Sequence, residues 1–219
     1  MNIKALVAVR SGSQRVENKN IRKFADSNLL SIKLEQLKRI PLLNGIVVNS
    51  NDNEMLKIAA KFGAETIKRD DYYASSYVNM SDVYVNMAEN FSGDIVLYAN
   101  VTNPLLNDET ITKAIEFFVS ENTENLSINS AHLVKEFMFR NNKPINYDLK
   151  NQPRSQDLPD IYVLNFAISI LRRETMISCR NVVGKNVRIF GIDNYEAIDI
   201  DNEIDFEIAE HLYMKKKSN

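Results

Sequence analysis

The 219-residue sequence has few of the residues that build disulfides and zinc centres. Cys179 is its one cysteine, and His132 and His211 are its two histidines. A single cysteine excludes an internal disulfide and a cysteine-built metal site, and two histidines leave a zinc centre short of ligands. We therefore expect neither redox nor zinc chemistry.

Long apolar runs are also missing from the sequence. No window approaches the roughly 18 apolar residues that a membrane span needs, and the apolar run at residues 3–9 is too short for a secretory signal. The 27 basic and 29 acidic residues give a formal net charge of -2, which provides no overall attraction to nucleic acid or to an anionic membrane. These features predict a cytoplasmic protein in which any anion site is local.

The length and composition fit one soluble domain spanning residues 1–219, with 44% apolar and 26% charged residues. Strand-like apolar segments alternate along the chain with segments whose apolar residues have helical spacing. The expected strands lie at residues 3–9, 46–48, 95–99, 161–171 and 187–192, and the expected helices at 30–37, 53–62, 81–90, after Asn107 and after Asn202. The alternation predicts an α/β fold, an open and mostly parallel sheet with helices on both faces.

Residues 126–160 interrupt this pattern. They contain an apolar cluster around Phe137 and Phe139 among basic and amide side chains, followed by three prolines. One interpretation is an excursion from the sheet that forms a subunit contact, because such a segment does not easily bury its aromatic rings alone. The other interpretation is a long surface loop that closes over its own domain.

A basic loop follows the first expected strand. Within residues 9–20, Arg10, Arg15 and Lys19 bring three cations against one acid, Glu17. Because open parallel sheets bind ligands at the carboxyl ends of their strands, this loop lies where a ligand would be held. Its Ser-Gly-Ser stretch lets backbone N–H groups approach an anion closely. A phosphate chain fits the loop, and the alternative is a solvated basic turn.

Two carboxylates near the C-terminus form a second candidate site. Asp199 and Asp201 are two residues apart on an expected strand, so their side chains point to the same face. Two carboxylates so placed repel each other unless a cation lies between them, and oxygen ligands of this kind suit Mg²⁺. The alternative is that Asp201 or Asn202 caps the last helix, with Glu203 and Asp205 favouring its dipole. The two interpretations are compatible.

Two further polar clusters are less specific. Residues 100–104 end the strand that starts near Ile95 and place amide and hydroxyl groups at the same sheet edge. Residues 154–159 and 162–167 include Arg154, whose guanidinium is suited to bidentate binding of a carboxylate. Taken singly, each cluster also fits an ordinary turn or surface segment.

In chain order these segments resemble the sugar-nucleotide cytidylyltransferases, and specifically the CMP-N-acylneuraminate synthetase family. The resemblance rests on residues 9–20, 49–52, 69–74, 100–105, 154–159, 162–167 and 199–206. The first and last matches are the specific ones. Residues 9–20 follow the family's Ala-Arg-x-Gly-Ser-Lys-(Gly/Arg)-(Ile/Leu)-Pro-x-Lys-Asn loop, and residues 199–206 keep its Asp-Ile-Asp-x-Glu-x-Asp-Phe run unbroken.

The resemblance implies transfer of CMP from CTP to the anomeric hydroxyl of a nonulosonic (sialic-type) 2-keto acid sugar, with release of pyrophosphate and Mg²⁺ as cofactor. It implies catalytic roles for Arg10, Lys19 and Asp201, and a metal site made by Asp199 and Asp201. The implied nucleotide-binding residues are Arg10, Ser11, Gly12, Ser13, Arg15, Lys19, Asn20, Arg69 and Asn100, and the implied sugar-binding residues are Thr102, Arg154, Gln156 and Asn165. Residues 126–160 correspond to the family's dimer-forming region, which implies a homodimer.

Several positions depart from the family's pattern. Gln14 and Glu17 replace a common lysine and a proline in the basic loop, and Phe166 replaces a glycine that would allow close approach of the sugar. Asn100 and Asn103 stand where glutamine and serine are usual. The departures leave the acceptor open. The alternatives are a cytidylyltransferase for a sugar phosphate or polyol phosphate, and a weakly active nucleotide-binding paralogue.

Overall fold

The computed structural model describes residues 1–13, 15–121 and 123–218, and across them seven strands form one sheet in the order β11-β7-β10-β6-β1-β4-β5. These strands are β1 (Ile3–Ala8), β4 (Gly45–Ser50), β5 (Glu65–Lys68), β6 (Ile95–Ala99), β7 (Leu126–Val134), β10 (Ile161–Arg172) and β11 (Asn186–Gly191). β1 pairs in parallel with β4 and β6, as β4 does with β5 and β11 with β7, whereas β10 runs antiparallel to β6 and β7. The predicted mostly parallel sheet is confirmed.

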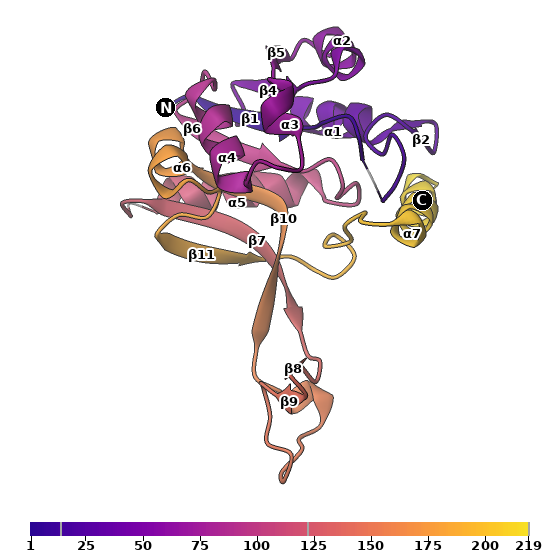
Figure 1. Ribbon diagram of the computed structural model, residues 1–219, viewed down its shortest axis with the longest axis vertical. Coiled ribbons are helices and arrows are strands. Elements are labelled where there is room, and N and C mark those ends of the chain that lie inside the picture. The colour runs from indigo at the N-terminus through magenta and orange to yellow at the C-terminus, as the bar shows by residue number, and fades with distance from the viewer. Residues whose placement is uncertain (14, 122, 219) are drawn as a thin grey trace.

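Helices cover both faces of the sheet, as the sequence pattern predicts (Figure 1). One face packs against α1 (Leu29–Lys38), α2 (Asn53–Lys61), α5 (Asp108–Ser120) and α7 (Glu203–Lys217), and the other against α4 (Met80–Glu89) and α6 (Arg173–Cys179). The short elements are β2 (Lys23–Phe24), β3 (Ser27–Asn28), α3 (Asp71–Ala74), β8 (Phe139–Arg140), β9 (Lys143–Pro144) and the 3₁₀ turn Ser155–Asp157. None of the described helices has the length and apolar character needed to cross a bilayer.

The strand directions gather the polar loops at one edge of the sheet. β1, β4, β6, β7 and β11 all run the same way, so the segments that follow them leave from their shared carboxyl edge. β10 runs in the opposite direction and therefore begins at that edge. Central strands such as β1 and β6 are apolar because helices cover both of their faces.

A long hairpin arm leaves this edge. The outer parts of β7 and β10 pair beyond the body of the sheet, and residues 135–160 form its far end with β8 and β9 (Figure 1). The excursion is therefore shorter than the sequence predicts, because residues 126–131 of β7 pair with β11 in the body of the sheet. The pattern is weak there because Ser127, Asn129 and Ser130 are polar yet fully buried.

Helix α1 buries a lysine against the loop that follows β6. Lys33 is 1% exposed, and its side-chain nitrogen donates to Gln36 Oε1 at 2.7 Å and to the Asn103 carbonyl at 3.2 Å. Burial lowers the pKa of Lys33 to about 7, and Lys216 acts in the same direction, whereas Asp108 and Glu196 oppose the shift. The cause is the hydration that the charged amine loses on burial.

This lysine makes the stability of the protein depend on pH above neutrality. Between about pH 7 and the ordinary lysine value of 10.5, the unfolded chain holds a proton that the folded chain has released, so the free energy of unfolding rises with pH. Urea unfolding at pH 7, 8 and 9 should show the wild type gaining up to about 1.4 kcal/mol per pH unit relative to Lys33→Met. A difference that does not change with pH would contradict the lowered pKa.

Candidate active site

A cavity of about 410 Å³ opens at the carboxyl edge, between the loop after β1 and the loop after β6. It brings together seven residues that the sequence analysis singles out, although the loops come from distant parts of the chain. Its lining residues are Ala8, Val9, Arg10, Ser13, Arg15, Val16, Lys19, Asn20, Asn100, Val101 and Thr102. With four polar residues and three cations among the seven, this cavity suits a polar anion.

Hydrogen bonds to the rest of the protein hold the basic loop in place. The Asn20 side-chain amide donates to the Arg10 carbonyl at 3.1 Å, and the Arg10 guanidinium donates to the Ala74 carbonyl. Gly12 has a φ of +77° with no atom near the position of a Cβ, so the backbone conformation and not crowding favours glycine there. The loop is thus fixed at both of its ends and turned by a glycine.

Ser11 and Gly12 do not line the cavity, unlike Ser13. The Ser11 backbone N–H donates to Asn51 Oδ1 at 3.1 Å, and the Asn51 amide donates back to the Ser11 hydroxyl at 3.0 Å. The N–H of Ser11 is therefore already used to tie the loop to the end of β4. Of the Ser-Gly-Ser stretch, Ser13 lines the cavity, and contact of Ser11 and Gly12 with an anion stays a prediction.

The acidic segment lies directly beside the basic loop. The side-chain nitrogen of Lys19 donates to the Ile200 carbonyl at 2.7 Å, and Arg15 forms an ion pair of 2.7 Å with Asp201. The Ile200 N–H donates to the Thr102 carbonyl at 3.0 Å, which ties the same segment to the loop after β6. Three separate parts of the chain therefore meet around one site.

Residues 197–201 are not a strand, contrary to the sequence prediction. Ile200 is fully buried, Asp199 is half-buried and Asp201 is exposed. The loop after β6 binds this segment through two separate hydrogen bonds and not through a strand ladder. The segment therefore follows an irregular path. The spacing nevertheless brings both carboxylates within electrostatic reach of Lys19.

The Asp199 carboxylate is suited to a cation. Burial raises its pKa, and Asp201 adds to the effect, while a hydrogen bond from Thr102 and the charge of Lys19 oppose it. Its Oδ1 atom is buried with no hydrogen-bond partner among the described residues. A buried carboxylate oxygen without a partner is costly, and a divalent ion would satisfy it. Asp199 and Asp201 thus fit a Mg²⁺ ion, which commonly takes one or two carboxylates together with substrate phosphates.

The protein supplies no complete metal cage here. Among the residues that the structure describes, no three or more His, Cys, Asp or Glu side chains gather in a way that would hold a metal ion. A bound ion would therefore draw further oxygen ligands from a substrate. That is the usual arrangement for Mg²⁺ bound together with a nucleotide.

The alternative role as a helix cap is confirmed for Asn202, which is the N-cap of α7, and not for Asp201. The Asn202 side chain accepts from the Asp205 N–H at 3.0 Å, and the Asp205 carboxylate accepts from the N–H groups of Asn202 and Asp201 at 3.0 and 2.9 Å. This reciprocal capping box begins α7. The Asp201 carboxylate is not used in the cap, and its partner is the exposed Arg15 guanidinium.

Lys19 lies within electrostatic reach of Arg15 and of both carboxylates. Its partial burial lowers its pKa, with a smaller effect of the same sign from Arg15, while Asp199 and Asp201 raise it. A triphosphate bound against Lys19 would favour the charged amine in the same way as the two aspartates. Arg15 thus pairs with Asp201, and Lys19 lies within electrostatic reach of both aspartates.

A strained bulge adjoins the cavity at Asn165 and Phe166. The register of β10 shifts between Leu164 and Ser169, and Phe166 has a φ of +52°. Positive φ favours glycine, which gives a physical reason for the glycine of the resemblance pattern at this position. The Ala167 carbonyl accepts from the Asn100 N–H at 3.3 Å, so the bulge contacts the loop that lines the cavity.

Buried hydrogen bonds set the orientation of Asn165. Its Oδ1 atom accepts from the Ser130 hydroxyl at 2.6 Å and from the Ala167 N–H at 3.2 Å. Its Nδ2 atom is buried and has no partner among the described residues. The Nδ2 atom of Asn165 is thus a hydrogen-bond donor that a ligand could use. Ser130 could not be predicted from the sequence, because a serine within an irregular segment gives no signal of a contact with a residue 35 positions away.

Three other predicted residues lie outside the cavity. The buried Arg69 guanidinium donates to Asn49 on β4, so its hydrogen bonds are made within the protein. Arg154 and Gln156 are exposed on the arm, where Arg154 pairs with Asp157 at 2.8 Å. The structure does not bring Arg154 and Gln156 to Asn165 within this chain.

Of the two departures in the basic loop, Glu17 can be placed relative to the cavity. Glu17 does not line it and lies instead beside a separate hollow with Asn18 and Asp52. Glu17 therefore does not add an acid to the lining of the cavity. Gln14 lies outside the described residues.

The fold and the site define the class of the protein. The solved structure of CMP:2-keto-3-deoxy-manno-octonic acid synthetase complexed with CTP matches it with a TM-score of 0.76 at 12% sequence identity, covering 99% of this chain and 100% of that chain. The fold is that of the nucleotide-diphospho-sugar transferases.

Sequence similarity defines the family within this class. The model of a family described as cytidylyltransferase matches residues 4–217. The chain is 31% identical to post-translational flagellin modification protein B of Campylobacter coli and 30% identical to CMP-N,N'-diacetyllegionaminic acid synthase of Campylobacter jejuni, in each case over 96% of this chain and 94% of the relative. The chain belongs to the cytidylyltransferase family and is a nucleotidyltransferase, which confirms the resemblance.

Proposed function

We propose that the protein transfers CMP from CTP to the anomeric hydroxyl of a nonulosonic acid, a 2-keto acid sugar, and releases pyrophosphate. One observation carries the proposal. The cationic loop that lines the cavity lies directly against the acidic segment, with Arg15 against Asp201 and Lys19 against the Ile200 carbonyl. The name of the legionaminic acid relative supports an acidic sugar as acceptor.

The cations would hold and neutralise the triphosphate. In-line attack on the α-phosphorus places charge on the phosphate oxygens and on the leaving pyrophosphate, so positioning and electrostatic stabilisation do most of the work. Arg10 and Lys19 would stabilise that charge. Ser13, Arg15, Asn20 and Asn100 line the same cavity and would bind the nucleotide. The buried Arg69 would support the site from beneath through its bonds to β4.

Asp199 and Asp201 would hold the metal ion. A bound Mg²⁺ supplies neutralisation of phosphate charge and a lower pKa for the attacking hydroxyl. Arg15 now pairs with the exposed Asp201, and an exposed ion pair is worth about 1 kcal/mol or less. Arg15 can therefore leave Asp201 for a phosphate at little cost. Thr102, which donates to Asp199, would connect the metal site to the sugar.

A second copy of the chain would complete the acceptor pocket. The arm carries exposed apolar side chains at Phe137, Phe139, Ile145 and Leu149, which a partner would cover. Arg154 and Gln156 lie on the same arm and would reach the sugar from the partner. We expect a homodimer in light scattering, and Phe139→Asp should shift it toward monomer.

A pyrophosphate-release assay tests the reaction. We expect release with CTP, Mg²⁺ and at least one acid from a panel of sialic, legionaminic, pseudaminic and shorter 2-keto acids, and none with sugar phosphates or polyol phosphates. If pyrophosphate is released only with a sugar phosphate or polyol phosphate, the proposed acceptor class is wrong. Measurable CTP binding without release on any acceptor would point to a paralogue that has lost catalysis.

Asn165→Asp should weaken binding of the acceptor sugar and leave binding of CTP nearly unchanged. The substitution replaces the unpartnered Nδ2 donor with a carboxylate oxygen that repels an acidic sugar. We expect the acceptor KM to rise by about tenfold to a hundredfold, the range for one hydrogen bond to a charged group, with the KM for CTP nearly unchanged. Asn90→Asp at the exposed end of α4 is the matched control. An unchanged acceptor KM would remove Asn165 from the sugar site.

A further inference from the structure

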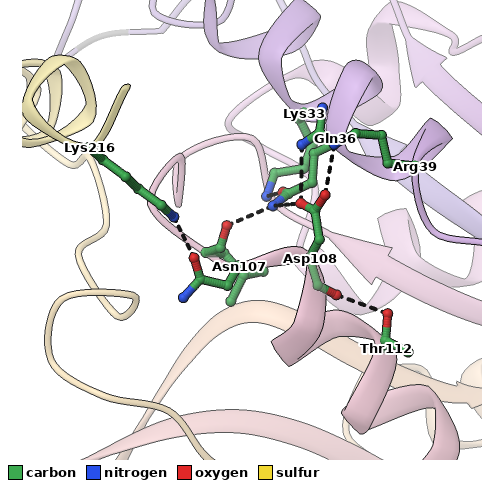
Figure 2. A network of polar contacts seen from close by, with 8 residues as sticks. Lys33, Gln36, Arg39, Asn107, Asp108, Thr112 and Lys216 are labelled. Atoms are coloured by element: carbon green, nitrogen blue, oxygen red, sulfur yellow. Dashed lines mark hydrogen bonds and ion pairs between the residues drawn. The ribbon is translucent and has the colours of Figure 1, made fainter. Parts of the chain in front are cut away.

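Side chains from two helices support the loop that follows β6. Figure 2 shows the neighbouring part of this network, in which Gln36 of α1 donates to Asp108 and Lys216 of α7 donates to Asn107. Lys33 donates to the Asn103 carbonyl at 3.2 Å, Gln36 donates to the Leu106 carbonyl at 2.6 Å, and Lys216 donates to the Leu105 carbonyl at 3.2 Å. The path of this loop is therefore set by side-chain donors and not by pairing with another strand.

The same loop holds the acidic segment. The Asn103 side-chain amide donates to the Ile198 carbonyl at 3.1 Å, and the Thr102 carbonyl accepts from the Ile200 N–H at 3.0 Å. These two bonds flank Asp199. Asn103 is fully buried and joins the two contacts, because its carbonyl binds Lys33 and its amide binds Ile198.

Burial of the Lys33 amine costs free energy, because the amine loses its hydration. Lys33 is 1% exposed, and the acceptors of its hydrogen bonds are an amide oxygen and a backbone carbonyl, neither of them charged. An apolar side chain of similar length would avoid the loss of hydration. What it would lack is the donor that fixes the Asn103 carbonyl.

We propose that Lys33 is a positioning residue for the Asp199 and Asp201 carboxylates, acting through Asn103. The inference rests on the metal role in the proposed function. Without the Lys33 donor, the loop after β6 loses one fixed carbonyl, and the backbone around Asp199 is free to move relative to Lys19. Residues that orient metal ligands without touching the metal typically change metal affinity by about tenfold to a hundredfold.

Binding of Mn²⁺ tests this role without relying on turnover. Mn²⁺ serves as a spectroscopic substitute for Mg²⁺, and electron paramagnetic resonance counts free Mn²⁺ in the presence of a non-hydrolysable CTP analogue. We expect Lys33→Met to raise the Mn²⁺ dissociation constant by about tenfold or more, and added Mg²⁺ to restore part of its turnover. Lys38→Met, on the exposed side of the same helix, should match the wild type.

Asn103→Ala tests the other hydrogen bond of the chain that links Lys33 to the acidic segment. It keeps the carbonyl that Lys33 binds and removes the bond to Ile198, so it should weaken Mn²⁺ binding to a similar extent. Combining it with Lys33→Met should add little. If Lys33→Met does not fold, unchanged Mn²⁺ affinity in Asn103→Ala overturns the inference, as does a folded Lys33→Met that binds like the wild type. A wild type that binds no Mn²⁺ overturns the metal role itself, and the inference with it.

Discussion

Asp201→Asn should abolish turnover, reducing kcat by about a thousandfold or more, while the fold and most of the affinity for CTP are retained. The substitution keeps the shape of the side chain and removes the charge that would hold the metal. The fold should survive because Asp201 is exposed and its carboxylate takes no part in the Asn202–Asp205 capping box. Single-turnover kinetics and calorimetric CTP titration measure the two effects separately.

Glu203→Gln is the matched control for that substitution. It removes the same charge two residues away, where Glu203 pairs with Arg22 at 2.7 Å in an exposed position. We expect its turnover to stay near the wild-type value. Equal losses in both variants would mean that general charge and not metal binding governs the reaction, and full turnover in Asp201→Asn would remove Asp201 from the metal role.

Lys19→Met should cause the second large loss, a fall of about a hundredfold to a thousandfold in kcat/KM for CTP, as removal of one stabilising donor does in other active sites. Lys19 lines the cavity and donates to the Ile200 carbonyl, so the variant loses both a phosphate-directed cation and a link between the two halves of the site. Initial rates at varied CTP concentration give this ratio.

Lys23→Met controls for the loss of one positive charge in the same region, since Lys23 is exposed on β2. Its kcat/KM should lie within about twofold of the wild type. A Lys19→Met enzyme with kcat/KM for CTP close to that of the control would show that Lys19 serves only to hold Ile200. The proposed contact with the triphosphate would then be wrong.

Most of the sheet could be predicted because its central strands are apolar on both faces. β1 and β6 give short continuous apolar runs, and α5, which follows β6, shows regular apolar spacing. β7 could not be predicted from that signal. Ser127 donates to Asn129, and Asn129 donates to Ser169 and to the Val182 carbonyl, so these polar groups are buried only because distant residues satisfy them.

The site was predictable to a similar degree. Position after a strand, together with charge, was enough to place Arg10, Arg15 and Lys19 at the cavity. The strand assumed for Asp199 and Asp201 was wrong, because hydrogen bonds from residues about 100 positions earlier hold that segment in an irregular path. Local sequence carries no information on such contacts.

Buried support residues were beyond the reach of sequence patterns for the same reason. Lys33 occupies a helical position that usually holds an apolar side chain, and its contact with Asn103 spans 70 positions. Arg69 was expected at the nucleotide, yet the structure buries its guanidinium against Asn49. A charged residue in a sequence suggests exposure or a ligand, and only the packing shows when it instead supports the backbone.

A crystal grown with CTP and Mn²⁺ tests the central claim most directly, because anomalous scattering locates the metal independently of the surrounding density. We expect one Mn²⁺ bound by Asp199, Asp201 and phosphate oxygens, with Arg10 and Lys19 on the same triphosphate. A nucleotide that contacts Arg10 and Lys19 while the Mn²⁺ lies elsewhere, or a metal at the carboxylates with no phosphate beside it, would contradict a single shared site.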